Sequence, residues 1–163
     1  MNKTLSVFSL LTTTCVILSC SKENVIIETP RYSGLVDARL ISYFESFEYE
    51  AALRGIDVDL DAQAINGFIK NIQEDDIAGT CSYQSHQPNV VPIDLEYWNA
   101  SSPLRREMVV FHELGHCNLG RGHLETAFDN GICTTIMNSG TSDCFVAYNS
   151  TNREYYLDEL FAQ

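Results

Sequence analysis

Three of the chain's four histidines, His112, His116 and His123, lie within twelve residues of one another. His112 and His116 are four residues apart, so on a helix their side chains project from one face, one turn apart. Two imidazoles at that separation can occupy two corners of a tetrahedral zinc site, and Glu113 lies between them as a base toward a metal-activated water. A third ligand from beyond the helix would leave one coordination position open, which is typical of a catalytic zinc site.

The residues around the histidines predict the helix that must carry them. The run His112–His116 (HELGH) is short, and it also occurs by chance on solvated helices. Here Ser102 and Pro103 indicate an N-cap followed by proline at the first helical position. Apolar residues follow at helical spacing, and Gly120 is the expected stop. We therefore predict a helix of about seventeen residues from Pro103, with the histidines in its last turns.

The segment 103–140 resembles the metzincin clan of zinc metallopeptidases. The clan's pattern is His-Glu-x-x-His-x-x-Gly-x-x-His, followed by a methionine turn. The residues that match it are His112, Glu113, His116, Gly120 and His123. The resemblance implies zinc as cofactor, with His112, His116 and His123 as metal ligands and Glu113 as the catalytic residue.

One spacing differs from the family pattern, because the stretch between His116 and Gly120 is one residue longer. One extra helical residue rotates the exit of the chain by about 100°. We expect Gly122 to absorb that rotation with a positive φ. The third ligand implied by the resemblance is His123, and Glu125 is the alternative, since carboxylates also bind zinc in other zincins.

The segment 134–140 (TTIMNSG) resembles the Met-turn of the same clan. The resemblance implies that Met137 forms an apolar floor beneath the histidines and does not bind zinc. Some clan members have a tyrosine two residues after the methionine that assists the oxyanion, and here Ser139 holds that position. Tyr148 is either a substitute for that tyrosine or a residue of the core.

The resemblance also implies a fold and an activity. The expected fold is α+β, a single zincin/metzincin-like domain with a small twisted sheet, a backing helix, the active-site helix, the Met-turn and a C-terminal helix. The expected activity is hydrolysis of peptide bonds by a zinc-activated water, with Glu113 as general base. Two other interpretations stay open. One is a zincin fold that binds a partner or a glycan without cleaving it, and the other is a structural zinc in an adhesin-like lipoprotein, with Glu125 as fourth ligand.

Hydrophobic periodicity predicts the elements around this site. We expect a helix over 36–54 that ends at Gly55, strands over 65–72, 77–83 and 90–98, and a closing helix over 151–161. By resemblance, the segment 77–83 is the edge to which a peptide substrate would add as an extra strand. An ordinary paired strand is the alternative for this segment.

The N-terminus predicts export as a lipoprotein. Lys3 precedes an apolar run over 5–18 that is short for a membrane span, and residues 17–20 (ILSC) resemble a lipobox. We predict a signal peptide over 1–19, lipidation of Cys20, a tether over 20–34 and the metallopeptidase domain over 35–163; a retained membrane anchor is the alternative. The stretch 21–24 resembles lipoproteins of the Bacteroidetes, which implies a lipid-anchored protein of the outer membrane in the cell envelope, with display at the cell surface as a further implication.

Composition limits the partners. Cleavage before Cys20 leaves 144 residues, enough for one domain with a core. Without Lys3, nine basic residues oppose 22 acidic ones, a net charge of −13. Nucleic acid is therefore not an expected partner, and docking on anionic lipid is disfavoured. We expect a monomer that acts on a peptide or protein substrate and is held at the membrane by the lipid on Cys20.

Four cysteines remain after Cys15 leaves with the signal peptide and Cys20 is acylated, and an even number in an exported chain predicts two disulfides. Three pairings are open. Cys133–Cys144 would close a loop around the Met-turn, and Cys81–Cys117 would tie a strand to the active-site helix. Cys117 is not expected to bind zinc, because it lies about 100° around the helix from the ligand face.

Processing at Cys20 is directly testable. Mass spectrometry of protein extracted from membranes should find a diacylated or triacylated Cys20 at the mature N-terminus. An unmodified chain that begins at Met1 would rule out the lipoprotein interpretation.

Overall fold

The computed structural model describes residues 32–74, 76–84, 87–139 and 147–162. Four helices and three strands lie wholly within this part of the chain, which confirms a small α+β domain. The predicted signal peptide, Cys20, residues 20–31 of the predicted tether and Cys144 lie outside the described residues. At the end of the tether, Tyr32 is buried and packs edge-on against Phe44, with ring centroids 5.8 Å apart. No helix in the described part of the chain is long and apolar enough to cross a membrane.

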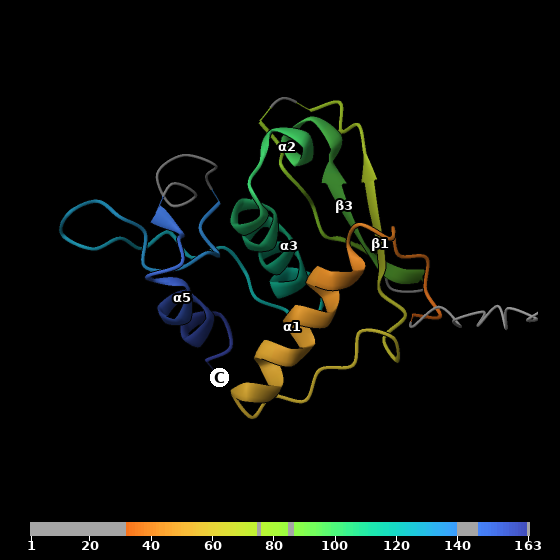
Figure 1. Cartoon of the computed structure of the whole chain (residues 1–163), viewed down its shortest axis with the longest axis horizontal. Helices are drawn as coiled ribbons and strands as arrows, with labels where there is room; N and C mark the ends of the chain where they lie inside the picture. Colours follow the sequence, from red (N-terminus) through yellow and green to blue (C-terminus); the bar gives the residue numbers. More distant parts are fainter. Residues whose placement is uncertain (1–31, 75, 85–86, 140–146, 163) are drawn as a thin grey trace, which may run out of the picture.

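A three-stranded sheet forms one side of the domain (Figure 1). Its strands are β1 (Asn66–Lys70), β2 (Ser82–Gln84) and β3 (Gln87–Asp94). β3 lies in the centre, parallel to β1 and antiparallel to β2. The predicted strand over 77–83 is strand only in part, because a single bridge from Gly79 to Ile93 precedes β2.

The predicted strand over 90–98 is wrong beyond Asp94, where α2 (Leu95–Ala100) begins. The Asp94 carboxylate accepts hydrogen bonds from the backbone N–H of Tyr97 at 2.8 Å and of Ile72 at 3.0 Å. The first of these bonds is an N-cap, which satisfies a backbone donor that the start of a helix leaves free. The cap outweighs the alternation of apolar residues that favoured a strand.

α1 (Ile41–Leu53) backs the sheet and begins five residues later than predicted. Val36 starts no helix, because it pairs with Gly67 in a parallel bridge. A Cβ at Gly67 would come within 2.8 Å of the Phe44 ring, so the glycine lets α1 approach β1 closely. The helix ends before Gly55, whose φ of +74° is the left-handed conformation expected after a helix.

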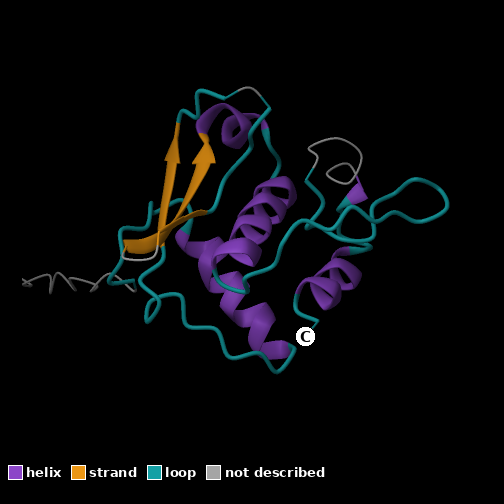
Figure 2. Cartoon of the chain, turned by 180° about the vertical axis from the view of Figure 1, so that it is seen from behind, coloured by secondary structure: helices purple, strands orange, loops and turns teal. Residues whose placement is uncertain are grey.

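α3 (Pro103–Cys117) lies at the centre of the domain and contacts both β3 and α1 (Figures 1 and 2). The predicted start is confirmed: Ser102 accepts a hydrogen bond from the Arg105 N–H, and Pro103 occupies the first turn. The ring of Phe111 packs edge-on against Phe47 of α1, with centroids 5.2 Å apart. The helix is therefore buried on two sides, against β3 and against α1, and it carries the histidines at its C-terminal end.

α5 (Arg153–Leu160), predicted as the closing helix, is held to the two other long helices by ion pairs. Arg153 lies 2.7 Å from Glu50 of α1 and 2.7 Å from Glu107 of α3. Phe161, just after α5, packs on Phe47 at a centroid distance of 5.0 Å. These contacts fix α5 on the side of α3 that is opposite to the sheet (Figure 2).

The predicted disulfide between Cys81 and Cys117 is confirmed, with Cα atoms 5.5 Å apart. It joins the segment before β2 to the last residue of α3, residues that are 36 apart in sequence. Cys133 is also disulfide-bonded, and Cys144, the partner predicted for it, lies outside the described residues.

Replacing both Cys81 and Cys117 by alanine should lower the free energy of unfolding by about 4 kcal/mol, because a closed loop of this length restricts the unfolded chain. Urea unfolding of the oxidised wild type and the double variant measures the difference. Equal free energies of unfolding for the two proteins would show that the disulfide does not stabilise the folded chain relative to the unfolded chain.

Candidate metal centre

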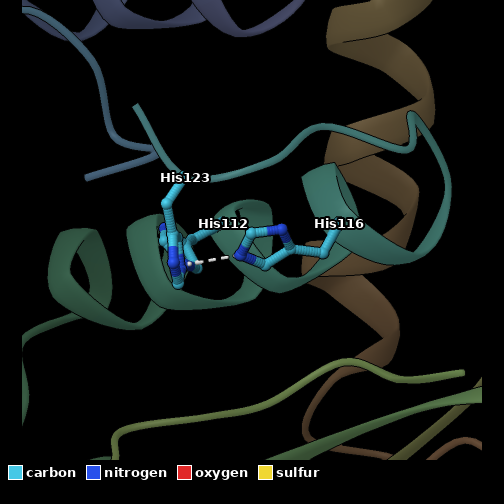
Figure 3. Close-up of side chains that lie close together, drawn as sticks. All are labelled: His112, His116 and His123. Atoms are coloured by element: carbon cyan, nitrogen blue, oxygen red, sulfur yellow. Dashed lines mark hydrogen bonds between the residues drawn. The ribbon is translucent and has the colours of Figure 1, made fainter. Parts of the chain in front are cut away.

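Three imidazoles converge at the end of α3 (Figure 3). His112 and His116 project from the helix, and His123 reaches them from the segment that follows it. Their candidate ligand atoms all lie within 4.8 Å of one another, and the Nε2 atoms of His112 and His116 are 3.1 Å apart. The predicted grouping of these three residues is confirmed, and together they could hold a metal ion.

The turn that returns His123 to the helix differs from the prediction. The positive φ expected at Gly122 occurs at Gly120, whose φ is +66°. Because α3 ends at Cys117, the extra residue of the spacer lies in the turn and adds no helical rotation. The turn is closed by a 3.0 Å hydrogen bond from the Arg121 N–H to the carbonyl of Gly115.

Backbone carbonyls set the tautomers of both helical histidines. Nδ1 of His112 lies 2.6 Å from the carbonyl oxygen of Ile136, and Nδ1 of His116 lies 2.6 Å from that of Arg121. A carbonyl oxygen can only accept, so each Nδ1 carries the proton and each Nε2 keeps its lone pair. Two such lone pairs at 3.1 Å repel one another and suit a shared cation.

The 3.1 Å separation of the Nε2 atoms of His112 and His116 is close to the spacing of two ligands in a tetrahedral zinc site. Zn–N bonds of about 2.0–2.1 Å place neighbouring ligand nitrogens about 3.4 Å apart. Burial lowers the pKa of His112 to about 4, and burial also lowers that of His116. Both imidazoles are therefore neutral at pH 7, which is the form that binds a cation.

Glu113 lies beside this group without belonging to it. Its side chain is buried, and burial raises its pKa to about 8. It rests against Gly79, where an added Cβ would come within 3.0 Å of Glu113 Cγ and 3.1 Å of Oε1. Glu113 and the three histidines line one cleft of about 600 Å³, and the segment from Asp76 to Cys81 also borders it.

Met137 is fully buried against α3. A Cβ at Gly115 would lie 2.7 Å from the sulfur of Met137, so the glycine between the two helical histidines makes room for the methionine. Sequence reasoning placed Met137 near the histidines but missed Gly115, although it lies inside the motif. The segment around Met137 is also joined to the residue that follows the third histidine, because the Leu124 N–H donates to the Met137 carbonyl at 2.9 Å.

Several residues considered from the sequence lie elsewhere. Glu125 is outside the histidine group, and its carboxylate accepts a hydrogen bond from the Ser139 N–H at 3.1 Å. The Tyr148 hydroxyl donates to Glu107 at 2.5 Å in the core, so Tyr148 belongs to the core. Cys117 is in a disulfide and is not a ligand.

No protein-family model, curated protein or solved structure matches this chain. The metal centre is therefore inferred from the geometry of its own residues.

The histidine group should bind one divalent metal ion per chain. His123→Ala removes one of the three converging nitrogens and should weaken binding strongly, whereas Glu125→Ala should have little effect. Affinity should also fall as the pH is lowered, because protons compete for the imidazoles. Competition with a chelator measures all three effects, and a larger loss in Glu125→Ala than in His123→Ala would contradict this ligand set.

Proposed function

We propose that the chain is a zinc-dependent endopeptidase of the metzincin type. The observation that carries this proposal is the position of Glu113. A buried carboxylate shares one cleft with three imidazoles, is adjacent in sequence to one of them and stays outside the ligand group. Three imidazole ligands and a further open position are the arrangement of catalytic zinc sites.

The proposed chemistry divides between the metal and Glu113. A bound zinc ion would polarise the peptide carbonyl and bring the pKa of a water toward neutrality. Glu113 would accept the proton of the attacking water and return it to the leaving amine. The pKa of about 8 applies to the side chain without a cation nearby. The charge of a dication lowers the pKa of an adjacent carboxyl group, which would make Glu113 available as a base at neutral pH.

The wall of the cleft opposite α3 suits an extended peptide. The residues on either side of Gly79 pair with β3 through their backbones. The Ala78 carbonyl accepts a 2.9 Å hydrogen bond from the Asp94 N–H, and the Thr80 N–H donates a 3.0 Å hydrogen bond to the Pro92 carbonyl. Backbone groups alternate in direction along an antiparallel strand, so the N–H and carbonyl of Gly79 point away from β3. Gly79 also lines the cleft. We propose that a substrate strand pairs with Gly79 on this side.

The two other interpretations of the sequence are less well supported. A structural zinc requires a fourth protein ligand, and Glu125, the residue considered for it, lies outside the group. A pure binding module has no need of Glu113, whose burial is unfavourable for the charged carboxylate.

We further propose that the protein is exported and anchored in the cell envelope through Cys20. The Cys81–Cys117 disulfide supports this location, because disulfides persist in oxidising compartments.

Glu113→Gln tests the catalytic assignment. The amide keeps the size of the side chain but cannot accept the proton, so turnover of a peptide library should fall by at least about 10²–10⁴-fold. Zinc content should stay at the wild-type value, because Glu113 is not a ligand. Glu125→Gln is the matched control and should keep its activity. Equal cleavage by wild type and Glu113→Gln would refute the proposed role, and no cleavage by zinc-loaded wild type would favour the binding module.

A further inference from the structure

We propose that Glu159, near the end of α5, is a positioning residue for the metal centre. Its two carboxylate oxygens hold the two chain segments whose carbonyls orient His112 and His116. This inference rests on the proposed metal site, and it concerns residues that lie far from the motif in the sequence.

The first oxygen acts on the segment that follows α3. Glu159 Oε1 forms an ion pair with the Arg121 guanidinium at 2.5 Å. The same guanidinium donates to the backbone carbonyls of Glu159 at 2.5 Å and Leu160 at 2.8 Å. Carbonyls in the last turn of a helix lack helical partners and attract a cation. Arg121 is thus fixed at three points, and its own carbonyl accepts the Nδ1 proton of His116.

The second oxygen acts on the Met-turn. The Thr135 hydroxyl donates to Glu159 Oε2 and accepts a 3.0 Å hydrogen bond from the Met137 N–H. Ile136 lies between these two anchored residues, and its carbonyl accepts the Nδ1 proton of His112. Thr135 is fully buried, and the Glu159 side chain is only 21% exposed. Hydrogen bonds to a charged group in such surroundings are stronger than those at an open surface.

The helix that presents Glu159 is itself immobilised. Arg153 ties α5 to Glu50 and Glu107, and the Tyr156 hydroxyl donates to the Cys133 carbonyl at 2.9 Å. Glu159 therefore connects the rigid helical core to both supports of the histidines. Partners of the non-ligating nitrogen fix the tautomer and ring orientation, and their loss typically weakens metal binding by about 10–100-fold.

The test compares two substitutions of the same kind on the same helix in the full chain. Glu159→Gln removes the charge that holds Arg121 and Thr135. Glu154→Gln is the control: Glu154 pairs with Arg54 at 2.9 Å and with Arg153 at 3.3 Å, but its side chain is 72% exposed and forms no hydrogen bond with Arg121 or Thr135. Zinc affinity, measured against a competing chelator, should fall by up to about 10-fold in Glu159→Gln, the lower end of the loss caused by removing a direct partner of the imidazole, and stay at the wild-type value in Glu154→Gln. Equal zinc affinities in the two variants would overturn the proposal.

A second readout separates positioning from simple stability. In metal-free protein, ¹⁵N NMR of the imidazoles should show His112 and His116 protonated at Nδ1 in wild type and in Glu154→Gln, and a mixture of tautomers in Glu159→Gln. Unchanged tautomers in Glu159→Gln would refute the positioning role even if its stability were reduced. If the wild type binds no zinc, the proposed function is refuted. The imidazole tautomers of the metal-free variants would still show whether Glu159 positions His112 and His116.

A third variant covers the case in which Glu159→Gln does not fold. Arg121→Ala removes the guanidinium but leaves the Arg121 carbonyl that accepts from His116. It should shift the tautomer of His116 and weaken zinc binding, with a smaller effect on His112. If Arg121→Ala keeps wild-type affinity and tautomers, Glu159 does not act through Arg121 and the proposal fails.

Discussion

Two imidazoles one helical turn apart can share a cation only if both present an unprotonated nitrogen to the same point. That condition requires a fixed acceptor for the proton on the other nitrogen of each ring. Here the acceptors are the carbonyls of Ile136 and Arg121, at 2.6 Å in both cases. Both lie outside α3, so the turn after the helix and the segment around Met137 are as much a part of the candidate metal centre as the histidines.

The cleft beside the histidines depends on close approaches that only glycine permits. Gly115 admits Met137 against α3, and Gly79 lies against Glu113. The Cys81–Cys117 bond then holds the segment that carries Gly79 to the end of the same helix. The outcome is a buried carboxyl group that is unfavourable for folding in its charged form, next to a site where a cation would offset that cost. Such a compromise is typical of functional sites.

Local sequence signals predicted the parts of the site that depend on local structure. Ser102 and Pro103 mark the start of α3, and the four-residue spacing places His112 and His116 on one face. The predicted strand over 90–98 is confirmed as far as Asp94 and is wrong beyond it, because the Asp94 side chain caps a helix that the apolar alternation did not reveal. No sequence pattern pointed to Glu159, because its role arises only when α5 packs beside two segments that are distant in the chain.

X-ray absorption spectroscopy of the zinc-loaded chain tests most directly whether three imidazoles bind the metal. The geometry predicts three imidazole nitrogens at about 2.0–2.1 Å and one further light atom that does not come from the protein. Scattering from fewer than three imidazoles, or a sulfur at about 2.3 Å, would contradict the ligand set on which the proposed chemistry depends.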